Sequence, residues 1–232
     1  MRTLESVTAD LRALGDEKYR PFNERIANIR PGSSIGVRMP QLRTYAKALV
    51  REERFSLQEL FLFPNDVYEI RLLKALCVGY CKFDFAERIA WIPRVIEVMD
   101  SWAVCDAFCS TLRIPMGEKR NFLQDIEYYV RQKTEFSQRF AYVFMRVNYV
   151  EAEYLPFIAS ALDCAEVRFY YTHMGAAWLL SEVLVRYFDR GVEYLRVGAL
   201  ADATKNKAIQ KACESYRLTA EQKNFLKLLK KG

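Results

Sequence analysis

Three features are scarce or missing in this sequence, and each absence excludes a class of protein. No stretch approaches the roughly 20 apolar residues that span a bilayer, although 51% of the 232 residues are hydrophobic. The first twenty residues include acidic side chains and no apolar segment, so we expect no signal peptide and a cytoplasmic location. His173 is the only histidine, and structural zinc sites usually combine cysteine with histidine. We therefore expect no membrane segment and no metal site.

The six cysteines and the net charge of +6 leave more than one interpretation. Cys105 and Cys109 are four residues apart, which places both thiols on one face of a helix. Without secretion they are expected to be thiols that act as small buried apolar residues. Basic residues concentrate in 38–54 and 205–231. Such segments can bind a polyanion or can form ordinary solvated helical faces.

Helical periodicity dominates, and no alternation typical of strands is present. Amphipathic helices are predicted for PQLRTYAKALVREE, with Pro40 in its first turn, for DVYEIRLLKALCVGYC, with Asp66 as N-cap, and for DFAERIAWIPRVIEVMD, which Pro93 kinks or splits. Further helices are predicted in 134–150, 166–188 and 204–231. Apolar helices recur in pairs every 35–45 residues or so, a period typical of HEAT-like repeats. We predict an all-α fold in a single domain, residues 1–232.

Trp102 and Asp106 form the first candidate for chemistry. Four residues apart on one predicted helix, they share a face about one turn apart. The aspartate lies among Trp, Val, Cys, Ala and Phe, where helix propensity does not explain it. Three interpretations stay open: a helix N-cap, a buried carboxylate paired with an arginine, or a charge placed in a cleft of low dielectric constant.

Arg139 and Trp178 add two further candidates from distant segments. Arg139 occurs among core-type residues in SQRFAYVFM, where a basic side chain often faces a carboxylate or phosphate. A structural Asp106–Arg139 salt bridge is the alternative. Trp178 follows Gly175, Ala176 and Ala177, small residues that allow close helix approach or leave a slot beside the indole. As a single residue, a core tryptophan is the simpler interpretation.

Five segments in order give the chain a family resemblance. They are GVRMPQLRTYAKAL, SWAVCDAF, QRFAYV, MGAAWLLSE and NKAIQKACESYRL, spread over nearly the whole sequence. Together they resemble the HEAT-like-repeat DNA alkylation repair proteins, the AlkD-type alkylpurine DNA glycosylases. The resemblance implies an alpha-alpha superhelix of helical hairpins, a C-shaped solenoid whose basic concave surface holds duplex DNA. It also implies hydrolysis of the N-glycosidic bond of N3- or N7-alkylated purines, with no cofactor.

The resemblance assigns roles to the candidate residues. Trp102 and Trp178 match the aromatic walls of the family's cleft, Asp106 matches its catalytic carboxylate and Arg139 its active-site arginine. Phosphate contacts are expected from the two basic segments, at Arg38, Arg43, Lys205, Lys207 and Lys211. The expected partner is duplex DNA with alkylated bases, bound by a monomer.

One position departs from the family pattern. Where family enzymes carry a further cleft tyrosine, alignment of RPFNERIAN places Arg25, with Tyr19 and Phe22 nearby. An arginine there could fill the cleft, so a non-catalytic HEAT-like-repeat DNA-binding protein is the second hypothesis. A protein-binding solenoid without a nucleic-acid role is the third.

Overall fold

A computed structural model describes residues 2–231, and these residues form helices joined by short turns. Within this range no strand is formed, although Gly15 and Val37 make one isolated antiparallel bridge. The predicted all-α class is confirmed. The chain packs as two compact units, unit 1 ending at Leu112 and unit 2 beginning at Arg113. This division does not test the single domain expected over 1–232, which remains a prediction.

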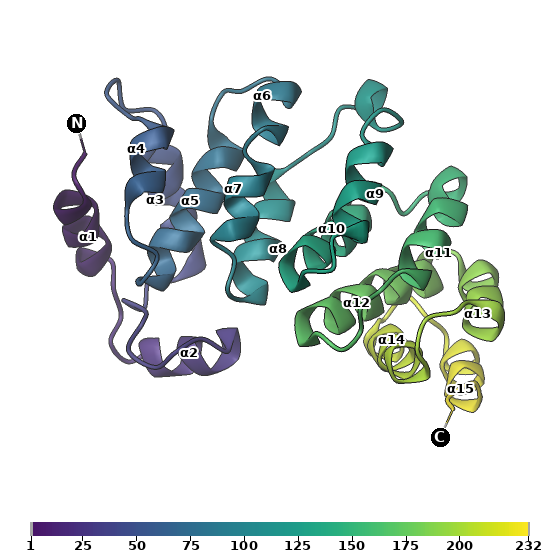
Figure 1. Cartoon of the computed structure of the whole chain (residues 1–232). Helices are drawn as coiled ribbons and strands as arrows, with labels where there is room; N and C mark the ends of the chain where they lie inside the picture. The colour runs from purple at the N-terminus through teal and green to yellow at the C-terminus, as the bar shows by residue number, and fades with distance from the viewer. Residues whose placement is uncertain (1, 232) are drawn as a thin grey trace. The chain divides into compact units, whose positions relative to one another are not determined.

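Unit 1 is built around a row of three helices, α3, α5 and α8, in which α3 packs on α5 and α5 on α8 (Figure 1). The central helix α5 is buried along most of its length because nearly every side chain between Ile70 and Val78 is apolar. The helices of this unit are α1 (Leu4–Ala13), α2 (Arg20–Ala27), α3 (Met39–Leu49), α4 (Leu57–Leu62), α5 (Tyr68–Tyr80), α6 (Phe85–Ile89), α7 (Ile92–Glu97) and α8 (Trp102–Thr111).

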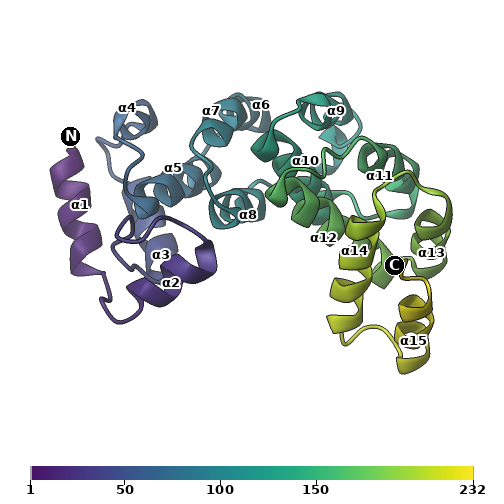
Figure 2. The same cartoon turned by 60° about the horizontal axis from the view of Figure 1, so that its bottom comes forward.

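Unit 2 repeats this pattern with the row α10, α12 and α14, against which α9, α13 and α15 pack from outside (Figure 2). Such rows of alternate helices are compatible with a stack of helical hairpins. Its helices are α9 (Leu123–Arg131), α10 (Glu135–Asn148), α11 (Leu155–Asp163), α12 (Tyr170–Arg186), α13 (Phe188–Val197), α14 (Asp202–Glu214) and α15 (Ala220–Leu228), with short 3₁₀ turns at Met116–Glu118 and Ala152–Tyr154.

The helix boundaries correct two details of the sequence-based prediction. Asp66 is not the N-cap of α5, because the helix begins at Tyr68 and Val67 occupies the cap position. Pro93 splits its segment rather than kinking it, since α6 ends at Ile89 and Pro93 occupies the first turn of α7. Pro40 does lie in the first turn of α3, as predicted.

A buried carboxylate fixes the loop between α2 and α3. Glu69 of α5 is fully buried and accepts backbone N–H bonds from Ile35 (2.9 Å), Gly36 (2.8 Å) and Val37 (3.2 Å). Gly36 has a φ of +88°, a left-handed conformation that favours glycine, and its carbonyl accepts the N–H of Asp16. The carboxylate thereby supplies acceptors for three loop N–H groups that lie outside any helix.

Candidate functional site

The helix α8 presents Trp102 and Asp106 on one face. Trp102 is its first residue and Asp106 comes one turn later, well inside the helix. The N-cap interpretation of Asp106 is therefore wrong. Both side chains are half-buried, while Cys105 and Cys109 turn into the core and are fully buried. The two cysteines thus serve as the small apolar residues that the sequence predicted.

Trp102 and Asp106 line a cavity of about 360 Å³ that lies entirely within unit 1. Its wall is strongly aromatic and apolar, with one carboxylate and one guanidinium. Its lining residues include Tyr19, Phe22, Ile26, Arg43, Trp102 and Asp106. An ionised group in such a wall interacts with a bound charge more strongly than it would in bulk water.

The helix α2 closes one side of this cavity through a direct bond. The indole Nε1 of Trp102 donates to the carbonyl oxygen of Ile26 at 3.0 Å, which ties the ring to the C-terminal end of α2. Phe22 of α2 and Tyr19, the N-cap residue of this helix, line the cavity, whereas Arg25 is exposed and is not among the lining residues. Its guanidinium carbon lies 5.9 Å from the Phe22 ring centre. The aromatic side chains of this segment, and not Arg25, therefore share the cavity with Trp102.

Of the two predicted basic residues of unit 1, Arg43 lines this cavity and Arg38 does not. Arg43 donates to the Tyr80 hydroxyl and to the Ser110 hydroxyl, both at 2.9 Å. Arg38 is exposed, pairs with Asp16 at 2.9 Å and lies 4.3 Å over the ring of Tyr19. The hydrogen bond from Arg38 also contributes to lowering the pKa of Asp16, after the backbone bond from Tyr19.

Arg139 is held in the seam between α10 and α12 of unit 2. It is 4% exposed, its Nη1 donates to the carbonyl oxygen of Tyr171 at 3.2 Å, and its guanidinium carbon lies 5.6 Å from the Tyr171 ring centre. Gly175 is buried beside it, and Ala176 is buried as well. The small residues before Trp178 thus allow close packing of α12 on α10, one of the two alternatives left open by the sequence.

Trp178 carries a cation on its ring. The guanidinium carbon of Arg146 lies 3.7 Å from the indole ring centre, and Arg146 also faces the carboxylate of Glu182 at 3.7 Å. Trp178 is half-buried, so it is not the plain core tryptophan of the simpler interpretation. Trp102 and Asp106 belong to unit 1 and Arg139 and Trp178 to unit 2, and their meeting in one groove stays a prediction.

The predicted basic residues of α14 differ in environment. Lys205 is 6% exposed and its ammonium donates to the carbonyl oxygen of Gly198 at 2.6 Å. Burial, followed by the nearby Lys231, lowers the pKa of Lys205. Lys207 and Lys211 are half-exposed. Lys205 therefore links α14 to the end of α13, and of these three lysines Lys207 and Lys211 present their charge at the surface.

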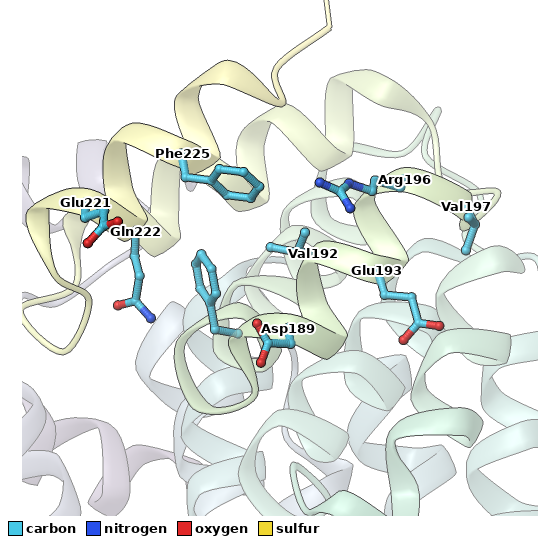
Figure 3. Close-up of a pocket in the computed structure, with 9 residues that line it drawn as sticks. Asp189, Val192, Glu193, Arg196, Val197, Glu221, Gln222 and Phe225 are labelled. Atoms are coloured by element: carbon cyan, nitrogen blue, oxygen red, sulfur yellow. The ribbon is translucent and has the colours of Figure 1, made fainter.

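A second cavity, of about 540 Å³, lies between α13 and α15 (Figure 3). Phe225 and Val192 face its interior, and Asp189, Glu193 and Arg196 lie around it. It contains none of the predicted site residues. Among residues 2–231, no three His, Cys, Asp or Glu side chains are grouped closely enough to hold a metal ion. Nor does any helix in the described range have the length and apolar character needed to cross a membrane.

A comparison with family models decides what kind of protein carries this aromatic, acidic cavity. The model described as DNA alkylation repair enzyme matches residues 7–216, which is most of the chain. The chain belongs to this DNA alkylation repair family. A comparison with curated proteins returned no match. The match runs through both units, so it covers the residues of the cavity at Trp102 as well as Arg139 and Trp178.

Sequence reasoning missed several residues beside the predicted ones in this DNA alkylation repair protein. Ile26, which binds the Trp102 indole through its backbone, carries no side-chain signal. Arg146 and Glu182 did leave a signal: Arg146 follows Arg139 by seven residues and Glu182 follows Trp178 by four. Those spacings place each on the face of its predicted neighbour.

Proposed function

We propose that this protein is a DNA glycosylase that removes N3- and N7-alkylated purines from duplex DNA by hydrolysing the N-glycosidic bond. The observation that carries the proposal is the shared cavity of Trp102 and Asp106 in a member of the DNA alkylation repair family. A fixed carboxylate beside a flat indole suits a reaction in which positive charge moves from a base to a sugar.

The reaction begins with a substrate that already carries the charge. An N7-alkylated purine is cationic, so the electrons of the C1′–N9 bond leave with the base and neutralise it. The sugar is left with oxocarbenium character, water adds to C1′, and the water proton passes to Asp106 or to solvent. The products are the free alkylated base and an abasic sugar. Asp106 stabilises the developing sugar cation and orients the water.

The aromatic residues bind the damaged nucleotide, and the arginines bind its backbone. Indole faces carry negative potential and attract cations, which favours an alkylated base or the cationic sugar beside Trp102. Arg43 has five N–H donors and uses one each for Tyr80 and Ser110, so others remain for a phosphate oxygen. Arg38, Lys207 and Lys211 are the other phosphate contacts that we propose.

Release of free base tests the proposal directly. Duplex DNA containing 7-methylguanine is incubated with the wild type, with Asp106→Asn and with Asp125→Asn, an exposed helical aspartate of α9 that serves as control. We expect base release by the wild type and the control, and a loss of about 10²–10³-fold for Asp106→Asn, the usual effect of removing one electrostatic contact to a transition state. Equal release by all three proteins would refute the role of Asp106.

A non-catalytic DNA-binding protein of the same family is the alternative function. It predicts duplex binding that weakens steeply with salt, since each neutralised phosphate adds about −0.9 to the slope of log K against log salt, together with no free base from any variant. The placement of Tyr19 and Phe22 in the cavity, in place of Arg25, favours the glycosylase over this alternative.

A further inference from the structure

Three arginines converge on a single buried carboxylate in unit 2. Glu182 of α12 is 8% exposed. Its Oε1 accepts from Nε of Arg186 at 2.6 Å and from Nη2 of Arg217 at 3.0 Å, and its Oε2 lies 3.7 Å from Nη1 of Arg146. The three arginines come from α12, from the turn after α14 and from α10, so the cluster joins three elements at one point.

The cluster holds more positive charge than its carboxylate neutralises. Burial alone would raise the pKa of the Glu182 carboxyl, but the hydrogen bonds from Arg186 and Arg217 outweigh burial and the pKa is lowered. Glu182 is therefore ionised at neutral pH, and arginine is always charged. Arg186 and Arg217 together carry two positive charges against the one negative charge of Glu182, which leaves a surplus of about +1. The side chains of Arg186 and Arg217 are 48% and 56% exposed, so this surplus faces solvent.

The cluster reaches Trp178 through Arg146. Glu182 follows Trp178 by one turn of α12, and the guanidinium of Arg146 stacks on the indole at 3.7 Å while it faces Glu182. A cation already on one face of an indole makes that ring less attractive to a second cation. The surroundings of Trp178 thus favour a negative ligand, in contrast to the cavity of Asp106 in unit 1.

We infer that Arg186 and Arg217, held in place by Glu182, bind a backbone phosphate of the DNA strand that passes Trp178. Guanidinium groups present paired N–H donors that match phosphate oxygens. Arg217 gives Glu182 its Nη2, while Arg186 gives Glu182 its Nε and gives the Val150 carbonyl its Nη1 at 3.5 Å, so N–H donors remain on both arginines. In this arrangement Glu182 is a positioning residue, and Arg146 links it to the indole. The identity of the ligand as DNA rests on the function proposed above, while the anion site rests on the charge and geometry of unit 2.

The slope of binding against salt tests the phosphate contact separately from catalysis. The probe is an undamaged duplex of about 20 base pairs, and its affinity is measured by fluorescence anisotropy between 50 and 200 mM salt. The variants are Arg186→Gln and Arg217→Gln. Arg190→Gln is the matched control, because Arg190 is an exposed arginine of the same unit that pairs with a single glutamate, Glu193. Circular dichroism melting confirms that each protein is folded.

We expect each cluster variant to bind three- to tenfold more weakly and to reduce the magnitude of the slope by about 0.9, the contribution of one phosphate. Arg190→Gln should keep the wild-type slope. Arg217→Lys, which keeps the charge but not the paired donors, should keep the slope and lose affinity.

Two failures are distinguishable. If the wild type does not bind duplex DNA, the proposed function fails. If the wild type binds and releases 7-methylguanine while Arg186→Gln and Arg217→Gln keep its slope, the proposed function stands. The cluster is then a structural ion-pair network and this inference is overturned. If a cluster variant does not fold, Arg217→Lys is tested in its place. An affinity of Arg217→Lys equal to that of the wild type would also overturn the inference.

Discussion

Replacing Glu69 by glutamine should destabilise unit 1 and disturb its cavity together. The buried carboxylate accepts three backbone N–H bonds from residues 35–37. The glutamine amide has the same shape, but its NH₂ group faces N–H donors where a carboxylate oxygen faced them. At least one buried N–H then loses its acceptor, and the remaining bonds lose their charge assistance.

The expected cost follows from these bonds. Leaving a buried donor without a partner costs about 1–3 kcal/mol, and weakening two charge-assisted bonds adds to it, so we expect a loss of roughly 3 kcal/mol in the free energy of unfolding. The loop leads through Val37 to Met39, and both side chains line the cavity of Trp102 and Asp106. Base release should therefore fall at temperatures well below the melting point.

The loss in free energy of unfolding is measured by urea denaturation, with circular dichroism as the signal. Glu53→Gln is the control, because Glu53 is exposed in the same unit. The control should change the free energy of unfolding by less than about 0.5 kcal/mol. If Glu69→Gln matches the control, the three N–H bonds do not hold the loop, and the structural account of this wall of the cavity is wrong.

Three further predictions concern the same unit. Gly36→Ala should cost about 2 kcal/mol, because φ is +88° and a Cβ would lie 2.6 Å from the Asp16 carbonyl, whereas Gly117→Ala, with open space around it, should not destabilise; thermal melts compare the two. Trp102→Phe removes the bond to Ile26 and should lower the free energy of unfolding, measured by urea denaturation, by about 1 kcal/mol. An unchanged free energy of unfolding would contradict a stabilising role of this bond. Burial lowers the pKa of Lys74 to about 8, so the unfolded chain binds more protons between that value and ~10.4, and stability should rise with pH there by up to about 1.4 kcal/mol per unit. Denaturation of wild type and Lys74→Met at pH 7.5 and 9.5 checks this sign, and an equal response of both proteins would contradict it.

The helices and one site pair were predictable from the sequence because they depend on local periodicity. The 3.6-residue spacing of apolar side chains predicted α3, α10 and α12, and the four-residue spacing of Trp102 and Asp106 placed both on one face. Helix ends were less predictable, since Val67, which makes no side-chain capping bond, occupies the cap position of α5 in place of Asp66.

Contacts between residues far apart in the chain could not be predicted from the sequence. The cluster of basic residues around Lys205 suggested a phosphate contact. This lysine instead points inward and donates to the carbonyl oxygen of Gly198, at the C-terminal end of α13. The convergence of Arg217 on Glu182 joins positions 35 residues apart, and it depends on how α14 packs on α12. The boundary at Leu112 coincides with no change in composition, because both units bury the same kinds of apolar residue.

The most direct test of the central claim compares catalysis with binding for one substitution. Single-turnover cleavage of a 7-methylguanine duplex is measured for the wild type and Asp106→Asn, alongside the affinity of each for the same duplex. We predict a first-order release of 7-methylguanine by the wild type and a rate lower by at least about 10² for the variant, with affinity changed by less than tenfold. Equal rates for the two proteins, or no release by the wild type despite tight binding, would contradict the account.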